Sequence, residues 1–249
     1  MKKQILLAVA VCSALMLKAG DQDLMMHGGG SSDSKLTIGI SVGAALPGSD
    51  WAAHAKNTSN DTTKRPDGFA MTGFHFDVSA GYQIAGPVGA MVLIGGNMNS
   101  FDATTYKSVY SVPSSESFSA TSYYSGQYLV GPFLSFGGDN FKFNIRVLVG
   151  LITCSTPTTT ASAGSFSDVE SGDAGSGFGY QFGAGIKYNF SSSLGLLVNV
   201  DYAGATITYT GYTDDQTLGS TSTTHTNTTL KQTMGYNNIT ASVGIAFNL

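Results

Sequence analysis

The sequence predicts an all-β protein: an eight-stranded antiparallel up-and-down β-barrel that spans a membrane. Charged residues make up only 11% of the 249 residues, well below the roughly 25% of ordinary soluble domains. Apolar residues recur with a period of two in segment after segment, which is the pattern of half-buried strands. Beyond the N-terminus no apolar run reaches the length of a membrane-spanning helix, so a helical membrane protein is excluded.

The first 20 residues have the pattern of a secretory signal peptide. Lys2 and Lys3 form a positive start, and the apolar core runs from Ile5 to Leu17; this order is typical of export signals. Residues 21–34 are polar and glycine-rich, and we expect a flexible leader there. The barrel domain is then predicted over residues 35–249. Removal of the signal would leave Cys154 as the only cysteine, which excludes an intramolecular disulfide.

Strand-like alternation begins just after the leader and continues to the last residue. Five segments show it clearly, and three more are weaker, with Met91 and Leu93 leaving the facing of one of them ambiguous. The clear segments are 36–44, 74–84, 141–151, 178–190 and 239–249, and the weaker ones lie near 88–98, 124–136 and 194–206. Together they predict eight strands.

The spacing of these strands alternates between long and short. Successive strand centres lie about 36 to 42 residues apart and then about 17 apart, which predicts long loops at one end of the barrel and tight turns at the other. The turns would be 85–87, 137–140 and 191–193, and the loops 47–68, 103–121, 155–175 and 210–232.

Charges inside the strands fall on the face opposite the large apolar residues. A cation that faces lipid at the middle of a bilayer costs roughly 2–4 kcal/mol, so these charges should face the lumen. An eight-stranded barrel is just wide enough for its own side chains, and we therefore expect a salt-bridged plug with Asp77 and Asp201 as partners of the cations. The predicted lumen network is His75, Asp77, Lys142, Asn144, Arg146, Gln181, Lys187, Asn199 and Asp201.

A soluble lipocalin-like barrel or a β-sandwich would also show alternation. Aromatic residues at both ends of the strands favour the membrane barrel, because they would form two interfacial girdles. Trp51 would either anchor in the outer interface or pack within a loop. The girdle residues are Tyr82, Phe136, Phe141, Tyr188, Phe190 and Phe247 at the turn end, and Tyr124, Phe178, Tyr180 and Tyr202 at the loop end.

With these features the chain resembles the small eight-stranded outer-membrane barrels of Gram-negative bacteria, the OmpA/OmpX-like superfamily. The resemblance implies periplasmic termini, extracellular loops, and outer-membrane lipids and lipopolysaccharide as surroundings. It also implies that the last strand, with Phe247 and Leu249, is read by the outer-membrane assembly machinery. Superfamily members of the OmpX type contact other surfaces through projecting strand edges.

Three functions are compatible with the sequence. The first is a structural or surface-interaction, adhesion-like protein that uses the four loops; alternation on both sides of Pro113 predicts a hairpin that projects from residues 104–120. The alternative is a porin or channel for small solutes, and the third is an enzyme that modifies outer-membrane lipid. His75 and Asp77 have no serine motif beside them, and the sequence predicts no metal site, cofactor or nucleic-acid surface.

Overall fold

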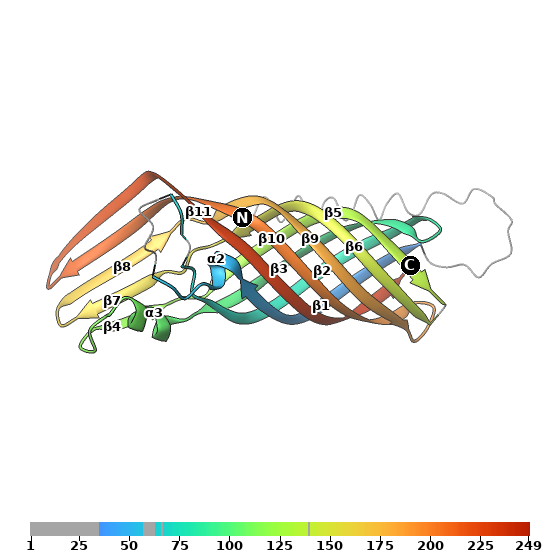
Figure 1. Ribbon diagram of the computed structural model, residues 1–249, viewed down its shortest axis with the longest axis horizontal. Coiled ribbons are helices and arrows are strands. Elements are labelled where there is room, and N and C mark those ends of the chain that lie inside the picture. The colour runs from blue at the N-terminus through green and yellow to red at the C-terminus, as the bar shows by residue number, and fades with distance from the viewer. Residues whose placement is uncertain (1–34, 57–62, 66, 139) are drawn as a thin grey trace. The chain divides into compact units, whose positions relative to one another are not determined.

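The computed structural model describes residues 35–56, 63–65, 67–138 and 140–249. The predicted signal peptide and leader lie outside the described residues. The described part consists mainly of antiparallel strands (Figure 1). The longer strands are β1 (Leu36–Gly48), β2 (Ala70–Ala85), β3 (Val88–Phe101), β5 (Tyr123–Gly137), β6 (Phe141–Cys154), β9 (Gly175–Asn189), β10 (Leu194–Leu218) and β11 (Thr221–Asn248). The shorter elements are α2 (Ser49–Ala52), α3 (Ala103–Val109), β4 (Ser117–Ala120), β7 (Thr159–Ala163) and β8 (Phe166–Gly172).

The eight longer strands close into a barrel. They pair in the order β11-β1-β2-β3-β5-β6-β9-β10, and β10 pairs with β11 to complete the ring. Every neighbouring pair is antiparallel. The predicted eight-stranded barrel is therefore confirmed, and the tight connections after β2, β5 and β9 join strands at one end of it. We call this the turn end, and the opposite end the loop end.

At the loop end the chain contains more strand than the sequence predicted. The sequence left open the conformation of the expected loops 155–175 and 210–232. In the structure β7 and β8 occupy most of the first, and β10 and β11 run through the second. The outer half of β10 pairs with β8, which pairs with β7, which pairs with β4. We call the sheet formed by β4, β7, β8 and residues 212–227 of the β10–β11 hairpin the projecting sheet.

The predicted hairpin over residues 104–120 is wrong. Residues 103–109 form α3, and only the short strand β4 follows it. Asp102 starts the helix, because its carboxylate accepts hydrogen bonds from the backbone N–H and the hydroxyl of Thr105, as an N-cap residue does. The tyrosines and serines that alternate around this segment therefore do not mark a strand.

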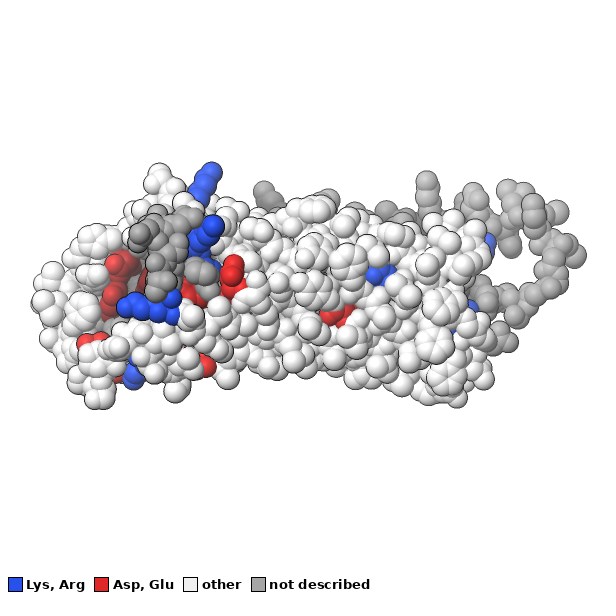
Figure 2. Space-filling view, in the orientation of Figure 1, with Lys and Arg blue, Asp and Glu red and all other residues white. Residues whose placement is uncertain are grey.

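The outer wall of the barrel is apolar. Phe76, Val130, Ile145, Phe182 and Val243 are each about half exposed and point away from the lumen. The middle of the barrel is nearly free of charged atoms on the face seen in Figure 2, whereas charges gather toward the loop end. The described residues contain no helix long and apolar enough to cross a membrane.

The structure also shows which residues of β3 face the lumen. Leu93 is buried and Met91 half-buried, whereas Ala90 and Met98 are exposed. The odd-numbered residues therefore face the lumen, which resolves the ambiguity left by the sequence. Met91 and Leu93 are apolar residues on the inner face, so alternation of hydrophobicity alone could not assign this strand.

Candidate functional site

The centre of the lumen contains a buried salt bridge between β6 and β10. Arg146 donates from Nε to Asp201 Oδ1 at 2.8 Å and from an outer nitrogen to Oδ2 at 2.5 Å. Its third nitrogen donates to the side-chain oxygens of Asn144 and Asn199 at 3.0 and 3.1 Å. Gln181 adds a hydrogen bond to Asp201 at 2.8 Å. Both charges are buried and matched, which is the arrangement that makes a buried ion pair tolerable.

This salt bridge passes over a glycine of the strand between its two partners. Gly183 of β9 lies opposite Arg146 on one side and opposite Asp201 on the other. A Cβ atom at Gly183 would lie within van der Waals overlap of both Asp201 Oδ1 and Arg146 Nε. The missing side chain therefore makes room for the bridge.

We expect Gly183→Ala to destabilise the barrel by about 1–3 kcal/mol, the usual cost of overpacking. Urea unfolding in lipid vesicles, followed by the fluorescence of Trp51, measures this. Gly48→Ala is the matched control, because a Cβ there would meet its nearest neighbour only at 3.9 Å. Equal stabilities for the two variants would contradict the packing argument.

A second cluster of polar side chains lies on β2 and β3. His75 Nε2 is 3.0 Å from Asp77 Oδ2, and His75 Nδ1 is 2.7 Å from Asn97 Oδ1. The Asn97 amide nitrogen donates to the hydroxyls of Tyr236 and Ser125, so its oxygen faces the histidine. Both ring nitrogens of His75 therefore lie against side-chain oxygens, one from Asp77 and one from Asn97. The expectation that Asp77 neutralises one of the lysines or Arg146 is wrong.

The two predicted lysines lie nearer the turn end. Lys142 and Lys187 are directly opposite each other on β6 and β9. Lys187 Nζ donates to Asn248 Oδ1 at 2.8 Å and to Thr37 Oγ1 at 3.3 Å, so it is held by polar groups of β11 and β1. Both lysines are half-buried. The nine predicted lumen residues thus divide into three groups along the barrel.

An apolar cluster that the sequence did not indicate fills the lumen toward the loop end. Trp51 of α2 is fully buried, with its ring centroid 4.5 Å from that of Tyr236 and 5.7 Å from that of Tyr123. The proposal that Trp51 anchors in the outer interface is therefore wrong, whereas packing within the barrel end is observed. Further members of the cluster are Leu93, Leu129, Leu148, Ile152, Ile207 and Met234.

The last strand ends beside the first. Phe247 is exposed on the outer face and pairs with Ile38 of β1 and Leu194 of β10. Leu249 lies just beyond β11, is exposed, and exchanges backbone hydrogen bonds with Leu36. These two residues therefore present apolar side chains on the outer surface at the turn end.

The projecting sheet contains a pair of facing carboxyl groups. One oxygen of Asp168 on β8 and one of Asp214 on β10 are buried without a hydrogen-bond donor, while Gln216 donates to the other oxygen of Asp214. Burial raises the pKa of Asp168 to about 6, and the hydrogen bond with Asp214 and the charges of Asp214 and Glu170 add to the increase. A shared proton would satisfy both buried oxygens.

This pair makes the projecting sheet sensitive to pH. The pKa of Asp168 is about 6 in the folded sheet against an ordinary value of 3.8, so the folded form binds the proton more tightly. The β8–β10 pairing should therefore gain stability as the pH falls through 6 and stop gaining below about 3.8. Hydrogen exchange of β8 amides at pH 5 and 7.5, corrected for intrinsic rates, measures this. Asp168→Asn should abolish the difference, and a persisting difference would contradict the assignment.

Metal ligation has no support in the described part of the chain, where no group of three or more His, Cys, Asp or Glu side chains could hold an ion. The barrel, its apolar wall and its polar lumen are instead typical of proteins that span outer membranes. Residues 5–247 match the model of the outer membrane protein beta-barrel domain. The chain belongs to this family. No curated protein matches it.

Three solved structures illustrate the similarity of fold. Neisserial surface protein A is 14% identical, with 87% of this chain and 98% of that chain covered and a TM-score of 0.45. Ail, the attachment invasion locus protein of Yersinia pestis, is 11% identical, with 85% and 98% covered and a TM-score of 0.41. The outer membrane protease OmpT from Escherichia coli is 8% identical, with 90% and 99% covered and a TM-score of 0.49. At these identities the likeness concerns the fold.

Proposed function

We propose that this protein is a closed outer-membrane barrel that acts as a structural and surface-contact, adhesion-like protein, and not as an enzyme. In this proposal the turn end and both termini face the periplasm, and the projecting sheet lies outside the cell. Lipopolysaccharide and membrane lipid surround the apolar wall, and the assembly machinery recognises the last strand with Phe247 and Leu249.

The observation that carries the proposal is the open edge of the projecting sheet. Residues 221–227 of β11 pair with β10, and the pairing of β11 with β1 ends at Asn237. Among the described residues no strand covers the other side of 221–227. An uncovered edge offers a row of backbone N–H and C=O groups that can pair with an extended segment of another protein.

The composition of this edge fits contact with other proteins better than contact with lipid. The edge reads Thr-Ser-Thr-Thr-His-Thr-Asn over 221–227, and its first six residues are exposed. Threonine favours extended backbone, so the strand is preformed without needing an apolar face. Backbone hydrogen bonds would then provide the affinity, and alternate side chains the specificity.

A proline scan of the edge tests this function. Alternate residues of an edge strand direct their N–H groups to the neighbouring strand or to solvent, so Ser222→Pro with Thr224→Pro and Thr223→Pro with His225→Pro probe the two sets. Thermal melting of each double variant shows which one leaves the hairpin intact. That variant has lost only backbone N–H donors that point to solvent. The measurement is adhesion of cells that display the protein, both to an epithelial monolayer and to one another.

We expect the intact-hairpin proline pair to lose most of the adhesion. The matched control is Ser222→Thr with Thr224→Ser, which changes side chains but retains every backbone donor, and it should adhere like the parent. Adhesion that survives the outward prolines, or that never exceeds that of cells without the protein, would overturn the contact role.

The small-solute channel is the second candidate. It needs an open lumen, and the buried bridge of Arg146 with Asp201 and the apolar cluster around Trp51 argue for a closed one. A lipid-modifying enzyme would need a nucleophile beside a base. His75 contacts Asp77 and Asn97 inside the lumen, where no lipid would reach it.

A further inference from the structure

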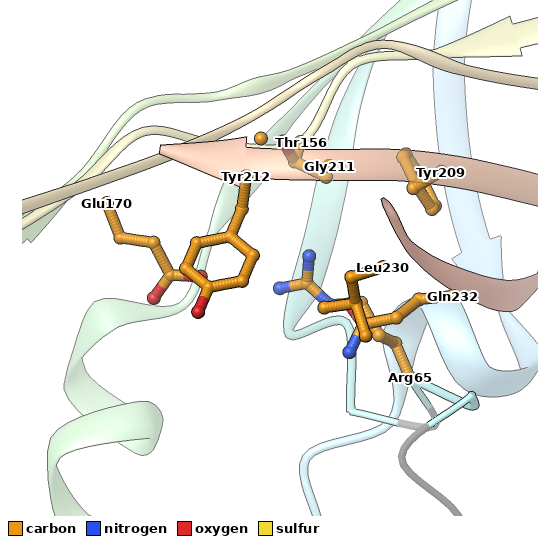
Figure 3. A pocket seen from close by; sticks show the side chains of 9 residues that line it. Arg65, Thr156, Glu170, Tyr209, Gly211, Tyr212, Leu230 and Gln232 are labelled. Carbon is orange, nitrogen blue, oxygen red and sulfur yellow. The ribbon is translucent and has the colours of Figure 1, made fainter. Parts of the chain in front are cut away.

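A small pocket lies where the projecting sheet joins the barrel. The strands kink here: the register of β10 and β11 shifts between Thr210 and Tyr212, and Gly211 has a φ of +82°. The pocket encloses about 100 Å³, somewhat less than a cavity of roughly 150 Å³ that holds benzene. It therefore suits a molecule of a few non-hydrogen atoms. The lining residues that matter for binding are Arg65, Thr156, Glu170, Tyr209, Tyr212 and Leu230 (Figure 3).

Arg65 contributes a positive charge to this pocket. Its backbone is fixed, because its N–H donates to the carbonyl of Thr233 at 2.9 Å. Arg65 is half-buried, and its guanidinium group points into the pocket (Figure 3). The side chain makes no ion pair or hydrogen bond with the described residues. A guanidinium group stays protonated and offers five donors that match a carboxylate. Among the described residues the guanidinium group therefore lacks an anionic partner within ion-pair distance.

Two buried hydroxyl groups in the lining lack oxygen or nitrogen partners as well. Tyr209 is 3% exposed, and neither its hydroxyl nor Thr156 Oγ1 has such a partner at hydrogen-bond distance. The thiol of Cys154 lies beside the Tyr209 hydroxyl, but sulfur is a weak acceptor. Leaving a buried polar group unsatisfied destabilises the folded protein. Both residues line the pocket, so a polar ligand there would supply the oxygen or nitrogen partners that these hydroxyls lack.

The lining also restricts the kind of ligand. The carboxylate of Glu170 lies across the pocket from Arg65 (Figure 3), which disfavours ligands that carry only negative charge. Tyr212 and Leu230 supply apolar walls. We propose that the pocket binds a small carboxylate with a neighbouring hydrogen-bond donor, a hydroxy acid or an amino acid. Arg65 binds the carboxylate, Glu170 accepts from the hydroxyl or ammonium group, and the Tyr209 hydroxyl completes the contacts.

Calorimetric titration of the folded, full-length barrel in detergent tests this proposal. The probes are glycolate and glycine, with acetate lacking the donor and ethanolamine lacking the carboxylate. We expect saturable binding of glycolate or glycine at least tenfold tighter than of either comparison compound, and the preferred probe identifies the donor. No saturable binding of either probe below about 10 mM, a standard binding free energy of roughly −3 kcal/mol, would overturn the proposal.

Two charge variants assign the roles. Arg65→Gln should weaken the binding of glycolate and glycine at least tenfold, and Glu170→Gln should remove their advantage over acetate. Lys64→Gln is the matched control, because it removes the same charge one residue away from a side chain that does not line the pocket; it should leave affinity unchanged. Unchanged affinity in Arg65→Gln, or equal losses in Lys64→Gln, would contradict the assignment.

Tyr209→Phe distinguishes a role of the Tyr209 hydroxyl in ligand binding from a role in the stability of the fold. Because this change deletes a buried hydroxyl that has no strong partner, the melting temperature should stay equal or rise, while the affinity for the preferred probe falls. A tyrosine with a purely structural role would not lower the affinity at unchanged stability. The outcome is independent of the adhesion assay, so the pocket and the surface-contact function fail or succeed separately.

Discussion

Arg146→Leu should lower the free energy of unfolding by about 3–5 kcal/mol, the cost of leaving one partner of a buried ion pair uncompensated. Asp201 would keep only the hydrogen bond from Gln181 while losing both contacts from the guanidinium group. Asn144 and Asn199 would lose a donor as well. Urea unfolding in lipid vesicles measures the loss, with Trp51 as the reporter because it is the only tryptophan in the chain.

The double variant Arg146→Leu with Asp201→Leu serves as the control for this prediction. Replacing both members of a buried pair with apolar residues is often neutral, so most of the lost stability should return. A single variant as stable as the parent would show that the bridge does not hold the lumen together. If the double variant were no more stable than the single one, the loss of stability would come from packing and not from an uncompensated charge.

Trp51→Ala should cost a similar amount, about 3–5 kcal/mol, because it empties a fully buried site in the apolar cluster. The ring of Trp51 contacts those of Tyr123 and Tyr236, so the loss removes the cover of the lumen at the loop end. The temperature at which the heated protein changes its gel mobility measures the effect without needing the tryptophan signal.

Trp51→Phe is the matched control for this second prediction. The indole N–H of Trp51 is buried without a partner, so phenylalanine gives up volume but also removes an unsatisfied donor. We expect it to lose less than half as much stability as alanine. Equal losses for the two variants would mean that the cluster does not depend on an aromatic ring at this position.

The barrel itself could be predicted from the sequence because lipid imposes one simple rule on it. Each outward position must be apolar, and a period of two therefore appears wherever a strand crosses. Lys142 and Arg146 could be assigned to the inner face by this rule alone. Leu93, which is apolar although it faces inward, shows where the rule gives no information.

The loop end could not be predicted, because no membrane constrains it. The Thr-rich segment from Thr221 onward was interpreted as a loop from its polarity, yet it forms the outer half of β11. Both sides of a projecting hairpin meet water, so its strands need no apolar face. The segment around Tyr106 alternates by composition but is helical, since Asp102 caps it.

The pairing of side chains within the lumen could not be predicted, because it depends on contacts between residues that are distant in sequence. The alternation of inward and outward residues along each strand showed that Asp77 and Asp201 face the lumen. It did not show which cation each would contact. His75, two residues from Asp77, takes the place expected of a lysine or Arg146. Trp51 and Tyr236 come from opposite ends of the barrel sequence, and no local pattern joins them.

Conductance across a planar lipid bilayer tests the central claim, the closed lumen, most directly. Purified protein whose gel mobility shifts on heating is folded, and its insertion is verified by protection of the barrel from protease. The closed lumen predicts no stable open channel from such protein, only brief events at the level of the bare bilayer. A steady, high-conductance state of the unmodified protein would contradict the closed lumen and favour the small-solute channel.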